Sequence, residues 1–232
     1  MTPLVLLPGM MCDARLWTPQ MAALGRRTVI HAAITEADAV PALAAAVLAE
    51  APPRFALAGL SMGGIVAMEI VRQAPERVQR LALLDTNPMA ERPEVRARRE
   101  PQIAKARDGH LLAVMRDEMK PHYLADGPGK APILDLCMDM ALSLGPEVFE
   151  RQSRALASRP DQQDTLRAYD GPALVLMGEA DRLCPRDRHD MMHALLRHSR
   201  LAVIEGAGHL PTLEQPGRTT AELVAWLEGT TS

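Results

Sequence analysis

Short apolar runs bounded by turn residues recur along the chain and predict buried β-strands. The runs cover residues 4–7, 28–31, 55–60, 80–85, 173–177 and 201–204. Few polar positions interrupt them, which is typical of strands that are covered on both faces, as in a parallel sheet.

Helical stretches lie between most of these runs. The apolar positions of residues 65–71 predict a helix that ends before Pro75, and residues 40–48 predict another helix with Pro41 in its first turn. This alternation predicts an α/β fold, with a mostly parallel sheet of about six strands and helices on both faces.

The alternation stops between Asn87 and Asp170. Helix-like stretches follow one another without a clear strand, and breaks are expected at Pro101, Gly109, Pro121-His122, Gly127–Gly129 and Gly145-Pro146. We therefore predict a core domain from residues 1–87 and 169–232 and an inserted helical segment at 88–168. The segment carries thirteen basic and thirteen acidic residues, so a charged substrate is not expected.

Composition indicates one globular domain with a small insertion. The chain has 232 residues, 47% hydrophobic content and a net charge of -3. Near-neutral charge and 3% aromatic content argue against a nucleic-acid partner. The longest low-charge stretch, residues 39–48, is too short to cross a bilayer, so no membrane partner is expected.

The cysteines and the first residues predict a cytoplasmic protein. Cys12, Cys137 and Cys184 are odd in number and widely separated, which favours free thiols in a reducing compartment. None of them is predicted to be a nucleophile. Residues 3–11 lack the basic and apolar pattern of a secretion signal.

A serine between glycines marks the corner where the third predicted strand meets the helix after it. In Gly59-Leu60-Ser61-Met62-Gly63, the tight turn favours glycine on both sides of Ser61. The following helix would stabilise negative charge that develops at the hydroxyl. The same residues also fit an ordinary helix N-cap serine in a glycine-rich turn.

This corner resembles the nucleophile elbow of the α/β-hydrolase superfamily. The resemblance covers nearly the whole chain, and the Leu7-Pro8-Gly9 opening and residues 158–161 are similar to the small carboxylesterase and enol-lactonase branch. It departs at the start, where family members commonly have two further antiparallel strands. The resemblance implies an α/β-hydrolase fold in which residues 88–168 form a helical cap over the serine.

Two further strand ends carry the remaining residues of a catalytic triad. Asp181 follows the fifth predicted strand and His209 follows the sixth, and the order Ser61, Asp181, His209 is that of the α/β-hydrolases. Carboxyl ends of parallel strands share one edge of a sheet, so these residues are expected to converge. Asp85, at the end of the fourth strand, competes with Asp181 for the role of the acid.

The loop after the first strand is expected to take part as well. The resemblance implies that the backbone N–H groups of Met10 and Met62 form an oxyanion hole. Methionines are adaptable apolar contacts. We therefore predict Met11, Met115, Met119 and Met138 as substrate contacts, although those in the inserted segment, with Met140, could instead fill its core.

His189 and His193 are spaced like two ligands on a zinc-binding helix. No third ligand is obvious, and nearby arginines favour an exposed helix face. We therefore expect no metal and no cofactor.

Together these residues predict a serine hydrolase acting through an acyl-enzyme. The expected bond is a carboxylic ester, lactone or thioester of a small to medium apolar substrate, and the expected assembly is a monomer or homodimer. The same triad also supports carbon-carbon bond hydrolases, lyases and cofactor-free perhydrolases, and a ligand-binding protein without turnover stays open as well.

Overall fold

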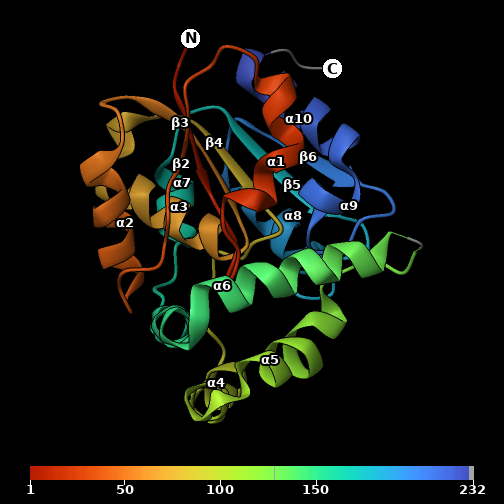
Figure 1. Cartoon of the computed structure of the whole chain (residues 1–232). Helices are drawn as coiled ribbons and strands as arrows, with labels where there is room; N and C mark the ends of the chain where they lie inside the picture. Colours follow the sequence, from red (N-terminus) through yellow and green to blue (C-terminus); the bar gives the residue numbers. More distant parts are fainter. Residues whose placement is uncertain (128, 230–232) are drawn as a thin grey trace.

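Six parallel strands form one sheet in the computed structural model, which describes residues 1–127 and 129–229. The strand order is β2-β1-β3-β4-β5-β6, and every neighbouring pair is parallel (Figure 1). The predicted fold class is confirmed. The strands are β1 (Leu4–Leu7), β2 (Val29–His31), β3 (Phe55–Leu60), β4 (Val78–Leu84), β5 (Ala173–Gly178) and β6 (Ser199–Ile204).

Two apolar cores lie on opposite faces of the sheet because successive strand residues point to opposite sides. Val5 and Leu7 of β1 belong to one core, whereas Leu4 and Leu6 belong to the other. Both sets are buried. The uninterrupted apolar runs of the sequence thus supply both cores at once.

Helices cover both faces, as predicted. One face carries α2 (Val40–Glu50), α3 (Met62–Gln73), α7 (Gln163–Ala168) and α8 (Arg186–Leu195). Each of these helices contacts the next one in this order. The other face carries α1 (Thr18–Met21), α9 (Pro211–Glu214) and α10 (Pro216–Glu228). The core domain also contains three short 3-10 helices: η1 (Ala14–Trp17), η2 (Ala22–Leu24) and η3 (Pro75–Arg77).

The inserted segment places its helices at the end of the sheet opposite to both termini (Figure 1). The elements are α4 (Pro93–Lys105), η4 (Ala106–His110), α5 (Leu111–Ala113), η5 (Val114–Met119), η6 (Lys120–His122) and α6 (Lys130–Ala157). Gly109 and Gly145 break the helical path with φ of 84° and 81°. The break predicted at Pro101 is wrong. Pro101 lies inside α4, and the carbonyl that it leaves unbonded belongs to the exposed Ala97, where water can reach it.

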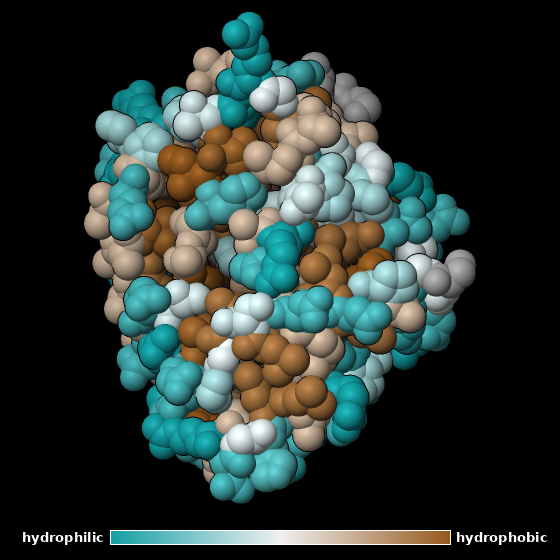
Figure 2. Space-filling view, in the orientation of Figure 1, coloured by the Kyte–Doolittle hydropathy of each residue, from teal (hydrophilic) through white to brown (hydrophobic). Residues whose placement is uncertain are grey.

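Apolar side chains on the face shown in Figure 2 form separate patches divided by polar ones. Leu112 and Leu142 of the inserted segment are among the exposed large apolar residues. Within residues 1–127 and 129–229, every helix is too short or too polar to cross a membrane.

Candidate active site

Ser61 lies at the corner between β3 and α3, in a strained conformation with φ 54° and ψ -114°. A Cβ atom on Gly59 would lie 2.3 Å from the Gly63 carbonyl oxygen, and one on Gly63 would lie 2.4 Å from the Leu7 carbonyl oxygen. Only glycine fits at these two positions because the atoms in the way belong to the backbone. The tight corner projects the Ser61 hydroxyl into a cavity at the carboxyl end of the sheet.

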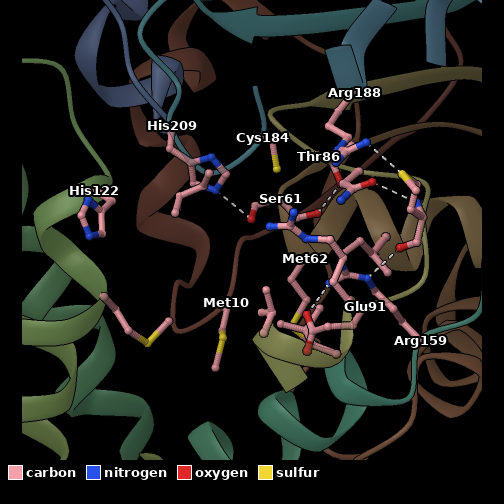
Figure 3. A pocket seen from close by; sticks show the side chains of 18 of the residues that line it. Met10, Ser61, Met62, Thr86, Glu91, His122, Arg159, Cys184, Arg188 and His209 are labelled. Carbon is pink, nitrogen blue, oxygen red and sulfur yellow. Dashed lines mark hydrogen bonds and ion pairs between the residues drawn. The ribbon is translucent and has the colours of Figure 1, made fainter. Parts of the chain in front are cut away.

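His209 joins Ser61 to Asp181, and Figure 3 shows the contact between His209 and Ser61. The His209 Nε2 atom lies 2.9 Å from Ser61 Oγ, and its Nδ1 atom lies 2.9 Å from Asp181 Oδ2. With Nδ1 donating to the carboxylate, Nε2 is left as an acceptor for the serine proton. The structure thus brings the three residues together as the sequence led us to expect.

Asp181 is held as a carboxylate. Its Oδ1 atom accepts from the N–H groups of Leu183 at 2.8 Å and Cys184 at 3.1 Å. Burial acts to raise the pKa of Asp181, but the charge of His209 and the hydrogen bonds from His209 and the two amides outweigh it, so the pKa is lowered. An ionised Asp181 can fix the His209 tautomer and stabilise the imidazolium form.

Asp85 occupies a different position, with a carboxylate oxygen within 4.8 Å of one of Asp181. It is fully buried, and its Oδ1 atom accepts from the Gly178 N–H at 2.8 Å. Its Oδ2 atom has no hydrogen-bond partner in the described part of the chain. Burial, and then the charge of Asp181, raise the pKa of Asp85 well above its ordinary value. Burial thus favours the neutral form of Asp85, which binds the end of β5, and Asp181 is the carboxylate at His209.

The loop after β1 lies directly beside Ser61. A Cβ atom on Gly9 would lie 3.7 Å from Ser61 Cβ, and within the described residues the Met10 N–H has no acceptor. Met62 is the first residue of α3, where backbone N–H groups have no acceptor within the helix. These two amides border the serine and suit a developing oxyanion.

Gln152 of α6 holds this loop in place, although no feature of the sequence predicted this role. Its Oε1 atom accepts from the Met11 N–H at 2.8 Å, and its Nε2 atom donates to the Ile34 carbonyl at 3.0 Å. Gln152 is fully buried. No local signal could have found it because its partners lie more than a hundred residues away in the chain.

Glu214 was also missed and holds the loop that carries His209. Its carboxylate accepts from the N–H groups of Gly208 and Leu210, each at 2.9 Å, and from that of Ala125 at 2.7 Å. The His209 N–H itself donates to the Tyr123 carbonyl at 2.7 Å. The inserted segment therefore helps to position the histidine.

Only one of the four methionines predicted as substrate contacts lines the cavity beside Ser61. The cavity has a volume of about 530 Å³, and Met119 borders it together with Met10 and Met62. Met11 and Met115 are fully buried in the core of the α3 face, and Met138 packs against that core. These three side chains do not line this cavity.

The thiols are held in their neutral form. Burial raises the pKa of Cys12 to about 12 and also raises the pKa values of Cys137 and Cys184. A thiol is a weak nucleophile until it ionises. Cys184, although it lines the cavity, therefore does not compete with Ser61.

His189 and His193 contact different partners. His189 is buried, with Nδ1 3.4 Å from the Pro185 carbonyl, and burial lowers its pKa to about 4. His193 Nδ1 lies 2.7 Å from Ser199 Oγ. The pair thus takes part in local hydrogen bonds. The expectation that the protein needs no metal stays a prediction.

Comparison with known proteins gives the family. The alpha/beta hydrolase family model matches residues 4–223, so the chain belongs to this family, as its sequence predicted. The chain is similar to a thermophilic esterase from Thermogutta terrifontis, solved with malate bound. The two share 28% identity and a TM-score of 0.90, over 100% of this chain and 91% of that one.

Curated relatives have similar levels of identity. A pimeloyl-acyl-carrier-protein methyl ester esterase of Pectobacterium carotovorum is 25% identical, and the match covers 98% of this chain and 94% of that protein. The biotin biosynthesis bifunctional protein BioHC of Cellvibrio japonicus is 24% identical over 92% of this chain, which spans only 45% of that longer protein. The chain is thus an enzyme of the α/β-hydrolase fold.

Proposed function

We propose that this carboxylic ester hydrolase cleaves its substrate through an acyl-enzyme on Ser61. The observation that carries the proposal is the continuous hydrogen-bond path from Ser61 Oγ through His209 to Asp181, with both steps at 2.9 Å. The esterase names of similar proteins support an ester as the bond that is cleaved.

The residues divide the reaction between them. His209 takes the proton of Ser61 as the hydroxyl oxygen attacks the ester carbonyl, and the Met10 and Met62 amides bind the oxyanion. Collapse of the tetrahedral intermediate releases the alcohol, which receives the proton from His209. Water then attacks the acyl-enzyme in the same way, with His209 again as the base.

The inserted segment, which we propose to be a cap over the serine, supplies much of the cavity wall. Apolar contacts for the substrate come from Met62 and Ile65 of α3 and from Met119 and Leu156 of the proposed cap. The volume of about 530 Å³ lies within the usual range of small-molecule sites. A carboxylic ester, a lactone or a thioester of modest size would fit this description.

A kinetic comparison tests the proposal. A panel of p-nitrophenyl esters, acyl thioesters and lactones is offered to the wild type, to Ser61→Ala and to Ser143→Ala, an exposed serine of α6 that serves as the control. We expect Ser61→Ala to lower kcat by at least about three orders of magnitude because nucleophile and base act as a unit.

The matched control should keep wild-type rates. If a correctly folded Ser61→Ala variant retained more than about a tenth of the activity, Ser61 would not be the nucleophile. If the wild type turned over no member of the panel, ester hydrolysis itself would be the wrong function.

A further inference from the structure

A buried ion cluster lies in the wall of the same cavity. Glu91, whose side chain is only 2% exposed, binds two guanidinium groups. Arg99 pairs with both carboxylate oxygens of Glu91, and Arg159 Nη1 donates to its Oε1 atom at 2.9 Å. Both arginine side chains are mostly buried, at 12% and 11% exposure. One carboxylate thus faces two permanent positive charges.

Arg188 of α8 adds a third guanidinium. Its Nη1 atom lies 3.0 Å from the sulfur of Met89, which is a weak acceptor, and 3.3 Å from the exposed carboxylate of Asp187. In the described part of the chain, Nε and Nη2 of Arg188 and Nη2 of Arg159 have no hydrogen-bond acceptor. Figure 3 shows Arg159, Arg188 and Glu91 on one side of Ser61, with His209 on the other.

The charges of the whole cavity are unbalanced. Two glutamates line it, Glu91 and Glu118. Six arginines line it as well, namely Arg92, Arg98, Arg99, Arg159, Arg182 and Arg188. Three of these residues pair with groups outside the cavity: Glu118 with Lys105 at 2.7 Å, Arg92 with Glu94 at 3.2 Å and Arg182 with Asp126 at 3.7 Å. Four of these arginines and both glutamates belong to the inserted segment, and the core adds Arg182 and Arg188, so the equal totals of the segment do not describe the charge of this cavity.

We propose that the substrate carries an anionic group, a carboxylate or a phosphate, which binds Arg188 and Arg159 while the ester lies at Ser61. This inference rests on the proposed function and adds the substrate class. Guanidinium groups bind both kinds of anion through paired N–H donors.

The burial of Arg159 supports this assignment. Burial lowers the pKa of Arg159, although the charge of Glu91 acts in the opposite direction. A partly desolvated cation gains from a second anion because Coulomb interactions strengthen away from water. The expected substrate is therefore an ester that is apolar near the bond that breaks and anionic at a distance from it.

Direct binding tests the inference without any need for turnover. Calorimetric titrations use glutarate as the carboxylate probe, butyl phosphate as the phosphate probe and glutaramide as the neutral control. Each probe is titrated into the wild type, into Arg188→Gln, and into Arg186→Gln as a matched control on the same helix. Arg186 is exposed and pairs with Asp190 outside the cavity.

We expect at least one anion to bind and glutaramide not to bind. Arg188→Gln should weaken the anion by about tenfold or more, the factor expected from one charge-assisted hydrogen bond, while Arg186→Gln should leave it unchanged. The anion that binds more tightly shows whether the charged group of the substrate is a carboxylate or a phosphate. Equal binding of glutaramide, or equal losses in both variants, would overturn the inference.

Kinetics on two matched esters separates this inference from the proposed function. Mono-p-nitrophenyl glutarate should have a lower KM than its neutral methyl diester, and the advantage should disappear in Arg188→Gln. Hydrolysis of both esters with equal KM would leave the function standing and refute the anion site. Binding of glutarate without hydrolysis of either ester would refute the proposed function and leave the anion site standing.

Discussion

Replacing Asp85 with asparagine separates the two acids at the strand ends. Asp85 is fully buried, makes no hydrogen bond with His209 in the described part of the chain and has a raised pKa, so burial favours its neutral form. Asparagine has the same shape and no charge, and its amide oxygen can still accept from the Gly178 N–H. We therefore expect Asp85→Asn to fold and to lose at most about tenfold in kcat, because it supports the loop without reaching the histidine.

The matched change at Asp181 should be far more costly. Asp181→Asn removes the carboxylate 2.9 Å from His209 Nδ1, so the imidazole can adopt the wrong tautomer and its cationic form loses stabilisation. The same replacement in serine proteases costs about four orders of magnitude in kcat, and we expect Asp181→Asn to approach that loss. A larger kinetic defect in Asp85→Asn than in Asp181→Asn would show that the acid is assigned to the wrong strand.

The stability of Asp85→Asn relative to the wild type should also depend on pH in a defined direction. The pKa of Asp85 is raised above its ordinary 3.8, so the folded state holds the proton while the unfolded state releases it. The wild type therefore loses stability as the pH rises from about 4 to the folded pKa, by up to about 1.4 kcal/mol per pH unit. The variant lacks this loss.

Urea unfolding of both proteins at several pH values measures this difference. The free energy of unfolding of Asp85→Asn, relative to the wild type, should rise as the pH increases above about 4. A relative stability that does not change with pH would mean that the Asp85 carboxyl is ionised in the folded protein, and the account of this buried acid would be wrong.

Three further results are expected. Gln152→Leu should lower the free energy of unfolding by about 2 kcal/mol in urea melts, because the buried Met11 N–H loses its acceptor, and an unchanged midpoint would contradict this. Gly63→Ala should lower it by about 1–3 kcal/mol or more, because its Cβ meets the Leu7 carbonyl oxygen at 2.4 Å; wild-type stability would show that the corner relaxes. EDTA should leave ester hydrolysis unchanged because Asp181 already binds His209 and two amides, and a loss restored by zinc would refute this.

The sheet could be predicted because the burial of each strand is visible in its own sequence as a continuous apolar run. Leu4–Leu7 is apolar at every position since alternate residues enter different cores, and the predicted bounds of this strand match the structure. Strand β4 begins at Val78, two residues before the prediction, because Val78 pairs with Phe55 of the neighbouring strand. That pairing is a tertiary contact that the local pattern does not contain.

The site also contains some residues that the sequence could predict and others that it could not. The residues at strand ends could be located since a parallel sheet brings its carboxyl ends to one edge, and the structure places Ser61, Asp181 and His209 in contact there. Gln152 and the charge of the cavity could not be predicted. They depend on how the inserted segment folds back over the core, which brings Arg159 close to residues far away in the chain.

Covalent labelling of the intact protein tests the central claim, that Ser61 is an activated nucleophile, most directly. The wild type and Ser61→Ala are incubated with a serine-directed fluorophosphonate, and their intact masses are measured. We predict that the wild type gains the mass of one phosphonyl group and that Ser61→Ala gains none, because His209 contacts the hydroxyl of Ser61 and activates it. An unlabelled wild type, or a variant that is labelled as readily, would contradict the account.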